Sequence, residues 1–378
     1  MFTGFTRFTG PRDRADRADR ADRADRARPP ARSRRTAWLS AQVLVLVLVA
    51  EAVMAATTVR TLLAPPAPHA AVTHALEPPL SVSKPFYPAT TRFYTDPHNP
   101  AASWVRAHPR DRRAAAIRRR IADQPQAAWF TQTNESLVEE QARGLVGAAA
   151  AQRRLPVLVA YAIPQRDCEQ YSSGGSGDAG VAYRRWIDAF TRGIGDRPAL
   201  VVLEPDALAH LGCLRKRQRA ERFAALAYAA RTLRERAPRT RVYYDAGNSG
   251  WQPARTMAGR LRHAGIDRYG DGIAVNVSNF NATGDEVRYG LSVLRELRRP
   301  RLGVVVDTSR NGAGPTHKHQ FCDPPGRRLG RAPTAATGIP GLDAFLWIKQ
   351  PGQADGCAAG AGVFVPGYAY RLTGRPTG

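Results

Sequence analysis

The stretch VVLEPDALAHL, residues 201–211, places an aspartate at the end of a run of apolar residues. Its first three residues are typical of a buried strand, and Glu204 and Asp206 end the run with two carboxylates on either side of Pro205. An aspartate in this position is often a helix N-cap. It is also where α/β barrel enzymes carry catalytic groups. The rest of the chain decides between these interpretations.

Apolar runs of the same kind recur along the chain from about residue 126. They are AAWFT (127–131), VLVAYAIP (157–164), ALVVLEP (199–205), RVYYDAG (241–247), GIAVNVSN (272–279), LGVVVDTS (302–309) and AFLWIK (344–349). Stretches with helical periodicity lie between most of them, at 180–193, 216–236, 253–264 and 285–298. In 216–236, one face carries Phe223, Leu226, Ala227, Ala230 and Leu233. Continuous apolar strands that alternate with amphipathic helices indicate a parallel sheet covered by helices.

A polar or charged group follows each of six strands at its C-terminal end. These groups are Asp167, Asp206, Asp245, Asn276, Asp307, and Lys349 together with Asp355. In a closed α/β barrel all of them converge on one mouth, whereas an open doubly wound sheet gathers ligand groups only near one switch point. The pattern therefore favours a parallel β/α (TIM-like) barrel with its active-site cleft at the strand C-termini. No GxGxxG motif and no P-loop support nucleotide binding.

Several aspartates that face one cleft repel one another, which keeps at least one of them protonated near neutral pH. A protonated carboxyl beside an ionised one is what the cleavage of a glycosidic bond requires. Trp104, Trp129 and Trp251 lie near these strands in the sequence and offer flat faces for sugar rings. The pattern thus points to a glycosidase.

Six motifs in register carry a resemblance to glycoside hydrolase family 6, the inverting β-1,4-glucanases and cellobiohydrolases. They are AYAIPQRDC (160–168), LEPDAL (203–208), YYDAGNSGW (243–251), AVNVSNFN (274–281), DTSRNGAGP (307–315) and LWIKQPGQADGC (346–357). Together with residues 99–130, the resemblance covers roughly residues 85–372. It implies a distorted α/β barrel.

The resemblance also implies roles for the cleft carboxylates. Asp206 matches the general acid. Asp167 matches the neighbour that raises the pKa of this acid and supports the water chain. Asp245 and Asp355 match the other two carboxylates, and Asp355 is sometimes proposed as the base, which is the least settled role in the family.

Further positions are implied in the same way. Tyr161 matches the tyrosine beside the distorted sugar, and Ser173 matches the serine that positions water. Trp104, Trp251, Asn276 and Lys349 match sugar-binding positions. The four cysteines indicate two disulfides beyond an export signal. The resemblance pairs Cys168 with Cys213 and Cys322 with Cys357.

Three positions depart from the family pattern. Asn248 replaces a histidine, Phe321 replaces a tryptophan, and Gln353 replaces a glutamate. All three are substrate-contact positions in the family, so they put substrate preference and turnover in doubt more than the reaction class. Only 12 residues separate Ser309 from Cys322. This segment and AGVFVPGYAYRL (361–372) resemble the endo-acting members, so we expect an open cleft. We also expect that the few residues after 372 leave no room for a carbohydrate-binding module.

The N-terminal part of the chain is outside the predicted barrel. Residues 1–36 hold eleven arginines and five aspartates in a low-complexity repeat and are expected to be disordered. Residues 37–59 fit an export signal or an uncleaved membrane anchor. We interpret 60–84 as an Ala/Pro-rich linker and 85–378 as the catalytic domain.

The net charge of +24 is nearly all arginine and is spread over the helices. A distributed excess of this kind specifies no nucleic-acid partner. His317, His319 and Cys322 lack further ligands at fixed spacing, so we expect neither a metal nor a cofactor. The prediction is a secreted or membrane-tethered monomer that cleaves internal β-1,4 bonds of glucans. The alternatives are a non-catalytic glucan-binding protein and an exo-acting cellobiohydrolase.

Overall fold

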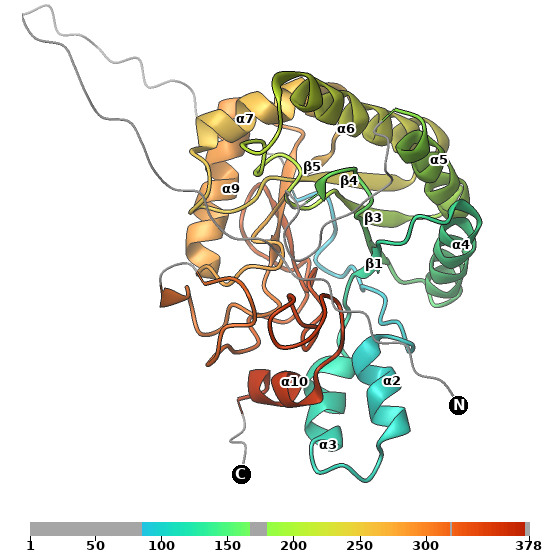
Figure 1. Cartoon of the computed structure of the whole chain (residues 1–378), viewed down its shortest axis with the longest axis vertical. Coiled ribbons are helices and arrows are strands. Elements are labelled where there is room, and N and C mark those ends of the chain that lie inside the picture. Colours follow the sequence, from blue (N-terminus) through green and yellow to red (C-terminus); the bar gives the residue numbers. More distant parts are fainter. Residues whose placement is uncertain (1–84, 167–179, 318–319, 375–378) are drawn as a thin grey trace, which may run out of the picture. The chain divides into compact units, whose positions relative to one another are not determined.

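Within the residues that the computed structural model describes (85–166, 180–317 and 320–374), seven parallel strands form one sheet in the order β1 to β7 (Figure 1). The strands are β1 (Ala128–Phe130), β2 (Val157–Ala160), β3 (Ala199–Leu203), β4 (Thr240–Asp245), β5 (Gly272–Val275), β6 (Gly303–Asp307) and β7 (Leu342–Leu346). Each of the seven predicted runs contains one of them, wholly or in part. The predicted parallel sheet is therefore confirmed.

Helices cover the outer face of this sheet (Figure 1). They are α4 (Glu135–Ala151), α5 (Ala182–Ile194), α6 (Lys216–Arg236), α7 (Ala254–His263), α8 (Ile266–Tyr269) and α9 (Thr283–Leu297). The four predicted helices correspond to α5, α6, α7 and α9, and α6 has the predicted bounds. Helix α4 was not predicted, because its buried stripe consists of small residues and valines that give little periodic contrast.

The buried face of α6 differs from the predicted one. Leu226, Ala230 and Leu233 are buried as expected, but Phe223 and Ala227 are only half-buried. The helix is turned so that alanines and Arg222 face inward. Alanines allow close approach to the sheet, and Arg222 donates to main-chain carbonyls of the loops after β2 and β3.

Apolar side chains alternate along each strand between two buried layers. Val159 and Val202 point into the barrel interior, whereas Leu158 and Val201 pack against the helices. Both faces of these strands are therefore shielded from solvent. This is why the strands appear in the sequence as continuous apolar runs.

The barrel is distorted where its first and last strands meet. The main-chain N–H of Ala127 donates to Trp347 O at 2.9 Å, and the indole of Trp129 donates to Ile348 O at 2.7 Å. Side-chain and single main-chain bonds of this kind join β1 to β7, in place of ladder pairing between the described strands. The predicted distorted, TIM-like barrel is confirmed.

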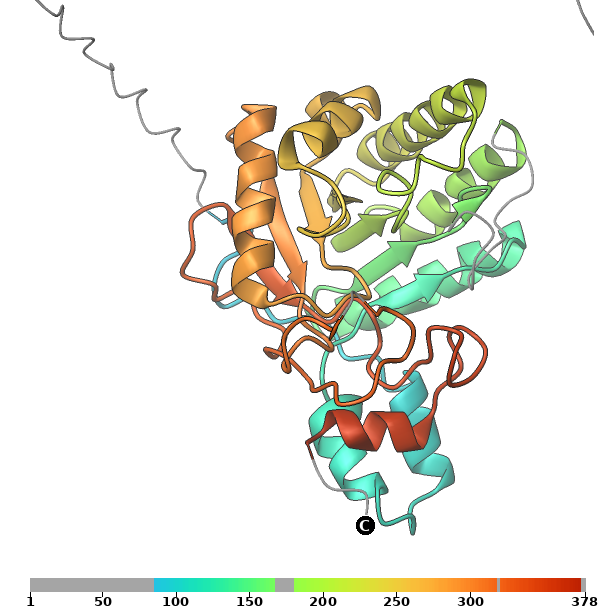
Figure 2. The same ribbon diagram turned by 60° about the vertical axis from the view of Figure 1, so that its left-hand side comes forward.

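A small helical lobe lies beside the barrel, below the loops in Figure 2. It comprises α2 (Pro100–Ala107), α3 (Ala114–Ile117), η1 (Arg118–Ala122) and α10 (Pro366–Leu372). Val105, Ile117, Ile121 and Ala369 belong to its buried core. The lobe thus joins segments from both ends of the described chain.

The predicted N-terminal segments 1–36, 37–59 and 60–84 lie outside the described residues, and their boundaries stay predictions. In the part of the chain that is described, none of the helices combines the length and the apolar character that a membrane span needs.

Candidate active site

A cleft of about 1010 Å³ opens at the C-terminal edge of the sheet. Most of its wall is built from residues in the loops that follow the strands. They include Thr131 after β1, Tyr161 and Arg166 after β2, Asp206 and His210 after β3, Trp251 after β4, Ser278 and Asn279 after β5, and Lys349 and Asp355 after β7. These side chains come from the segments after six strands, and Phe321, which follows β6, adds the seventh, as expected for a barrel enzyme.

Asp206 lies in the cleft on a strained main chain. It and Glu204 have φ angles of 70° and 49°, in the left-handed region that non-glycine residues rarely adopt. Such a conformation persists only where the surroundings hold it. Here the N–H of Asp206 donates to Asp245 Oδ2 at 3.0 Å, and the same oxygen accepts the N–H of Gly247 at 3.0 Å.

The side chain of Asp245 is directed at this main chain and not at the cleft. It is only 2% exposed and does not line the cavity. Burial, and then the charge of Asp206, hold the pKa of Asp245 well above the ordinary aspartate value. Asp245 is therefore placed to act on Asp206 from behind.

Other buried carboxylates bind main-chain groups around the mouth of the barrel in the same way. Glu204 accepts from the loop after β2, Asp307 accepts from the loops after β5 and β7, and Glu286 of α9 accepts from the loop after β4. Each buried carboxylate is satisfied by the N–H groups of a neighbouring loop. The strand-end acids were expected to face one cleft, but Asp245 and Asp307 instead fix the loops that surround it.

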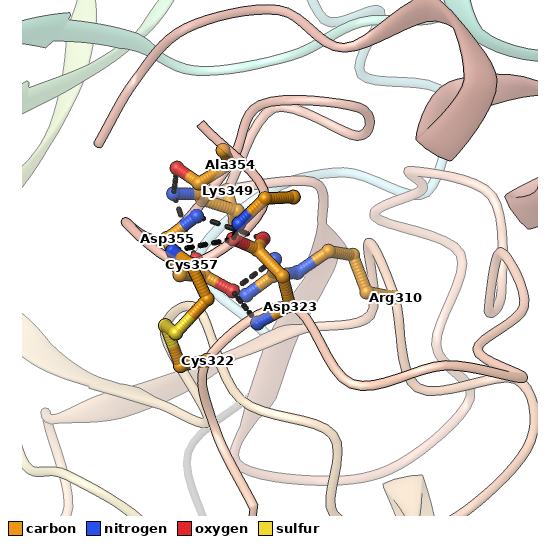
Figure 3. Close-up of a disulfide and its surroundings, with 8 residues drawn as sticks. Arg310, Cys322, Asp323, Lys349, Ala354, Asp355 and Cys357 are labelled. Carbon is orange, nitrogen blue, oxygen red and sulfur yellow. Dashed lines mark hydrogen bonds and ion pairs between the residues drawn. A yellow bond between two sulfur atoms is a disulfide. The ribbon is translucent and has the colours of Figure 1, made fainter. Parts of the chain in front are cut away.

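Asp355, which also lines the cleft, forms the centre of a charged cluster (Figure 3). Its carboxylate accepts from Arg310 Nη1 at 2.7 Å and from Lys349 Nζ at 3.0 Å. Arg310 is fully buried, and the other two side chains are about 10% exposed. Burial alone would raise the pKa of Asp355, but Arg310 and Lys349 outweigh it and lower that pKa.

A disulfide supports this cluster. Cys322 and Cys357 are bonded, as the sequence resemblance implied, and Asp323 lies beside them (Figure 3). Asp323 Oδ1 accepts the N–H of Asp355 at 2.8 Å, and its Oδ2 accepts the N–H of Cys357 at 3.0 Å. The two loops that meet at Asp355 are thus held together both covalently and by hydrogen bonds.

The sequence model described as "Glycosyl hydrolases family 6" matches residues 88–364. The chain belongs to this family. Endoglucanase 1 from Streptomyces sp. (strain KSM-9) is 48% identical over 72% of this chain and 75% of its own length. Endoglucanase A from Thermobispora bispora is 47% identical over 74% of this chain, and the match spans only 61% of that relative.

Solved structures agree with the family assignment. The endoglucanase Cel6 from Mycobacterium tuberculosis, in complex with methyl-cellobiosyl-4-deoxy-4-thio-β-D-cellobioside, is 42% identical and superposes with a TM-score of 0.70. That match covers 75% of this chain and 97% of the other. The catalytic core of the cellobiohydrolase Cel6A from Chaetomium thermophilum is 26% identical, with a TM-score of 0.64, over 75% of this chain and 96% of that core.

Five of the residues that the family 6 resemblance singled out meet in the cleft. They are Tyr161, Asp206, Trp251, Lys349 and Asp355. Asn276 does not, because its fully buried side chain donates to Asp307 O at 2.9 Å. Trp104 is not among the cleft-lining residues either, and its ring stacks on His108 with centroids 5.0 Å apart.

Three of the predicted site residues have no described position. Asp167, Cys168 and Ser173 lie outside the described residues. Cys213 is disulfide-bonded. Its expected partner, Cys168, lies outside the described residues, so the pairing of these two stays a prediction.

Arg166 and His210 line the cleft of this family 6 chain but were not assigned from the sequence, and Trp129, which was expected to offer a flat face to sugar rings, lines it as well. Trp129 packs edge-on against Tyr161 at 5.3 Å, and Arg166 lies over the Tyr161 ring at 4.5 Å. His210 lies against Trp251 with ring centroids 4.9 Å apart. His210 follows Asp206 by four residues in the same turn, where its N–H donates to Asp206 O at 2.9 Å, and its place in the strand-end stretch VVLEPDALAHL is a signal that could have identified it.

The three departures from the family pattern have different environments. Phe321 and Gln353 line the cleft, and Phe321 is 46% exposed. Asn248 is buried, and its Oδ1 accepts the N–H of Gly250 at 2.9 Å, so it shapes a turn beside Trp251. Two of the three can therefore affect substrate contacts directly.

No group of three or more His, Cys, Asp or Glu side chains that could hold a metal ion occurs among the residues that the structure describes. The carboxylates of Asp245 and Asp355 are instead bonded to main-chain N–H groups or to Arg310 and Lys349.

Proposed function

We propose that this family 6 chain is an exported, inverting endo-β-1,4-glucanase in which Asp206 is the general acid. The observation that carries the proposal is the setting of Asp206, which lines the cleft on a constrained left-handed main chain next to the buried Asp245. A proton donor needs a fixed position relative to the leaving oxygen. The constrained main chain and its hydrogen bond to Asp245 both fix the position of Asp206.

Inversion requires a second group that activates water on the opposite face of the sugar. Asp355 is already paired with two cations that lower its pKa, so its carboxylate is a weak base. We assign it an electrostatic role, balancing Lys349 and Arg310 at the cleft wall. Asp167 and Ser173, which the family resemblance matches to the residues that support and position the water, are our candidates for that role.

Three observations support internal cleavage of a β-glucan. Relatives at 44–48% identity are named endoglucanases, whereas those named probable cellobiohydrolases are 30–31% identical over about half of the chain. The thio-oligosaccharide bound to the M. tuberculosis relative supports a β-glucan as the substrate class. The segment between Ser309 and Cys322 is also short.

The test is hydrolysis of carboxymethylcellulose and mixed-linkage β-glucan by the purified chain. Viscosity should fall faster than reducing ends appear, and Asp206→Asn should lose at least about 100-fold in kcat with an unchanged circular dichroism spectrum. Proton NMR of early products should show the α-anomer. A fully active Asp206→Asn variant, or a retained β-anomer, would contradict the assignment.

A non-catalytic glucan-binding protein is the second candidate, because Phe321 and Gln353 change the cleft wall. Binding of cellohexaose without any turnover would favour it. Export, release or membrane tethering, and a monomeric state stay proposals. Mass spectrometry of the mature N-terminus and light scattering test them.

A further inference from the structure

Two buried ionisable residues, Glu204 and Arg222, bind the main chain of the loop after β2, and Arg222 also binds Ala207, next to the proposed proton donor. Glu204 is 1% exposed and Arg222 is 4% exposed, and neither lines the cleft. Burial of ionisable side chains such as these is costly unless each is well bonded. Their partners show what these side chains hold in place.

Glu204 binds the loop that follows β2. Its Oε2 accepts the N–H groups of Ala162 and Ile163, both at 3.0 Å, and its Oε1 accepts the hydroxyl of Tyr183 at 2.9 Å. This loop begins at Tyr161, which lines the cleft. Glu204 itself lies two residues before Asp206, so one side chain joins the two cleft loops.

Arg222, on helix α6, binds the same two loops from the other side. Its Nη2 donates to Pro164 O at 2.9 Å and to Gln165 O at 3.1 Å, and its Nη1 donates to Ala207 O at 3.0 Å. Ala207 directly follows Asp206. The planar guanidinium reaches three carbonyls at once, which the single ammonium of a lysine cannot match.

The main chain of the two loops that these bonds join is strained at three residues. Glu204, Asp206 and Gln165 all have positive φ angles, of 49°, 70° and 55°. Each such residue costs on the order of 1 kcal/mol or more and relaxes when its surroundings no longer fix it. The bonds of Glu204 and Arg222 oppose that relaxation shortly before and immediately after Asp206.

We propose that Glu204 and Arg222 form a clamp that positions Asp206 relative to Tyr161 and Arg166, which the neighbouring loop after β2 carries into the cleft. They are positioning residues, which act through Asp206 without touching substrate. The proposal rests on the proposed function, in which Asp206 is the proton donor. Loss of the clamp then impairs protonation of the leaving oxygen more than it impairs substrate binding.

The test compares two leaving groups in the variants Glu204→Gln and Arg222→Lys. The first replaces a carboxylate oxygen by an amide NH₂ that faces N–H and O–H donors, and the second loses at least one carbonyl partner. On cellohexaose, kcat should fall about 10- to 100-fold while KM changes less than about threefold. A dinitrophenyl cellotrioside departs without a proton, so its hydrolysis should fall less than about threefold. Asp206→Asn should show the same selectivity between the two substrates.

Asp343→Asn is the matched control. Asp343 is also buried and accepts one main-chain N–H, from Phe86 at 2.6 Å, and one tyrosine hydroxyl, from Tyr243 at 2.8 Å. Its N–H partner belongs to the segment that precedes the barrel, and Asp343 does not line the cleft. The control should lose thermal stability and keep the wild-type ratio of rates on the two substrates.

Thermal melts establish that each variant is folded, and Arg222→Lys decides the question if Glu204→Gln does not fold. The clamp is overturned if folded variants keep the wild-type kcat on cellohexaose, or if they lose equally on both substrates. A wild-type chain that hydrolyses neither substrate overturns the proposed function, and the clamp with it. An active wild type with unaffected clamp variants overturns the clamp alone.

Discussion

The carboxylate of Asp245 accepts a hydrogen bond from the main-chain N–H of Asp206 at 3.0 Å, while the charge of Asp206 helps to raise the pKa of Asp245. The two acids therefore act on each other in two ways, through geometry and through charge. One lines the cleft and the other is buried.

Asp245→Ala tests the hydrogen bonds that Asp245 accepts from the main chain at Asp206. The N–H groups of Asp206 and Gly247 both donate to the single oxygen Oδ2, so an asparagine could keep both bonds through its carbonyl oxygen, whereas alanine removes the acceptor. We expect kcat on β-glucan to fall about 10- to 100-fold with a small change in KM. Asp271→Ala, which removes a carboxylate bonded to Val242 near the start of the same strand, is the control. Equal losses in both variants would contradict a specific role for Asp245.

The stability of the fold should depend on pH through Glu204. Burial raises the pKa of Glu204 from 4.5 to about 7, so the folded state holds this proton more tightly than the unfolded state. This contribution is fully present below pH 4.5 and is lost as the pH rises through 7. It amounts to up to about 3 kcal/mol.

Urea unfolding of wild type and Glu204→Gln between pH 4.5 and 8 measures this effect. The difference in unfolding free energy, wild type minus variant, should fall across the window, since glutamine does not titrate. Asp343, whose pKa burial raises to about 6, contributes equally to both proteins. Parallel curves would exclude Glu204 as the titrating group.

Asp355→Asn should destabilise the fold strongly. It leaves the buried guanidinium of Arg310 and the ammonium of Lys349 without their shared carboxylate. Removing one partner from a buried ion pair costs about 3–5 kcal/mol, which differential scanning calorimetry would register. Asp267→Asn, which removes a half-exposed pair with Arg299, should cost less than about 1 kcal/mol. Similar melting temperatures for the two variants would contradict the role of the cluster.

The disulfide between Cys322 and Cys357 closes a loop with a sequence separation of 35 residues. Replacing both cysteines by serine should cost about 4 kcal/mol, because the unfolded chain regains the entropy of the open loop. The loss should appear in denaturant midpoints measured without reductant. A midpoint equal to that of the wild type would show that the disulfide adds nothing to stability.

Phe321 offers a partly exposed ring to the substrate. Phe321→Ala should raise KM for cellohexaose about 3- to 10-fold, since an aromatic contact contributes about 1 kcal/mol, and should leave kcat within about twofold. Phe321→Trp should lower KM. Leu137→Ala on α4, at a similarly exposed apolar residue that does not line the cleft, is the control. An unchanged KM in Phe321→Ala would place the ring outside the substrate path.

The sheet could be predicted from the sequence because its strands are buried on both faces, which makes each of them a continuous apolar run. The position of Asp206 followed from the same reasoning. The direction of a strand-end side chain did not, because it depends on loop conformation. Asn276, with a φ of 64°, turns into the protein, and Asp245 binds a neighbouring loop.

Contacts between residues that are far apart in the sequence could not be predicted either. Arg310 is 45 residues from Asp355 in the sequence, and nothing in their local motifs indicates that they meet. Arg222 was not among the residues predicted to face the sheet, and a charged residue on a helix is usually exposed. The carbonyl groups of the two loops explain its burial.

The buried carboxylates around the mouth of the barrel determine which residues of this site can be substituted during evolution. Glu204, Asp245, Glu286 and Asp307 fix the loops through main-chain groups, which are the same for any side chain on those loops. Substitutions at the cleft surface, such as those at Phe321 and Gln353, can therefore accumulate while the frame that carries them stays intact. The fold thus separates the residues that can be varied for new glucans from the residues that cannot.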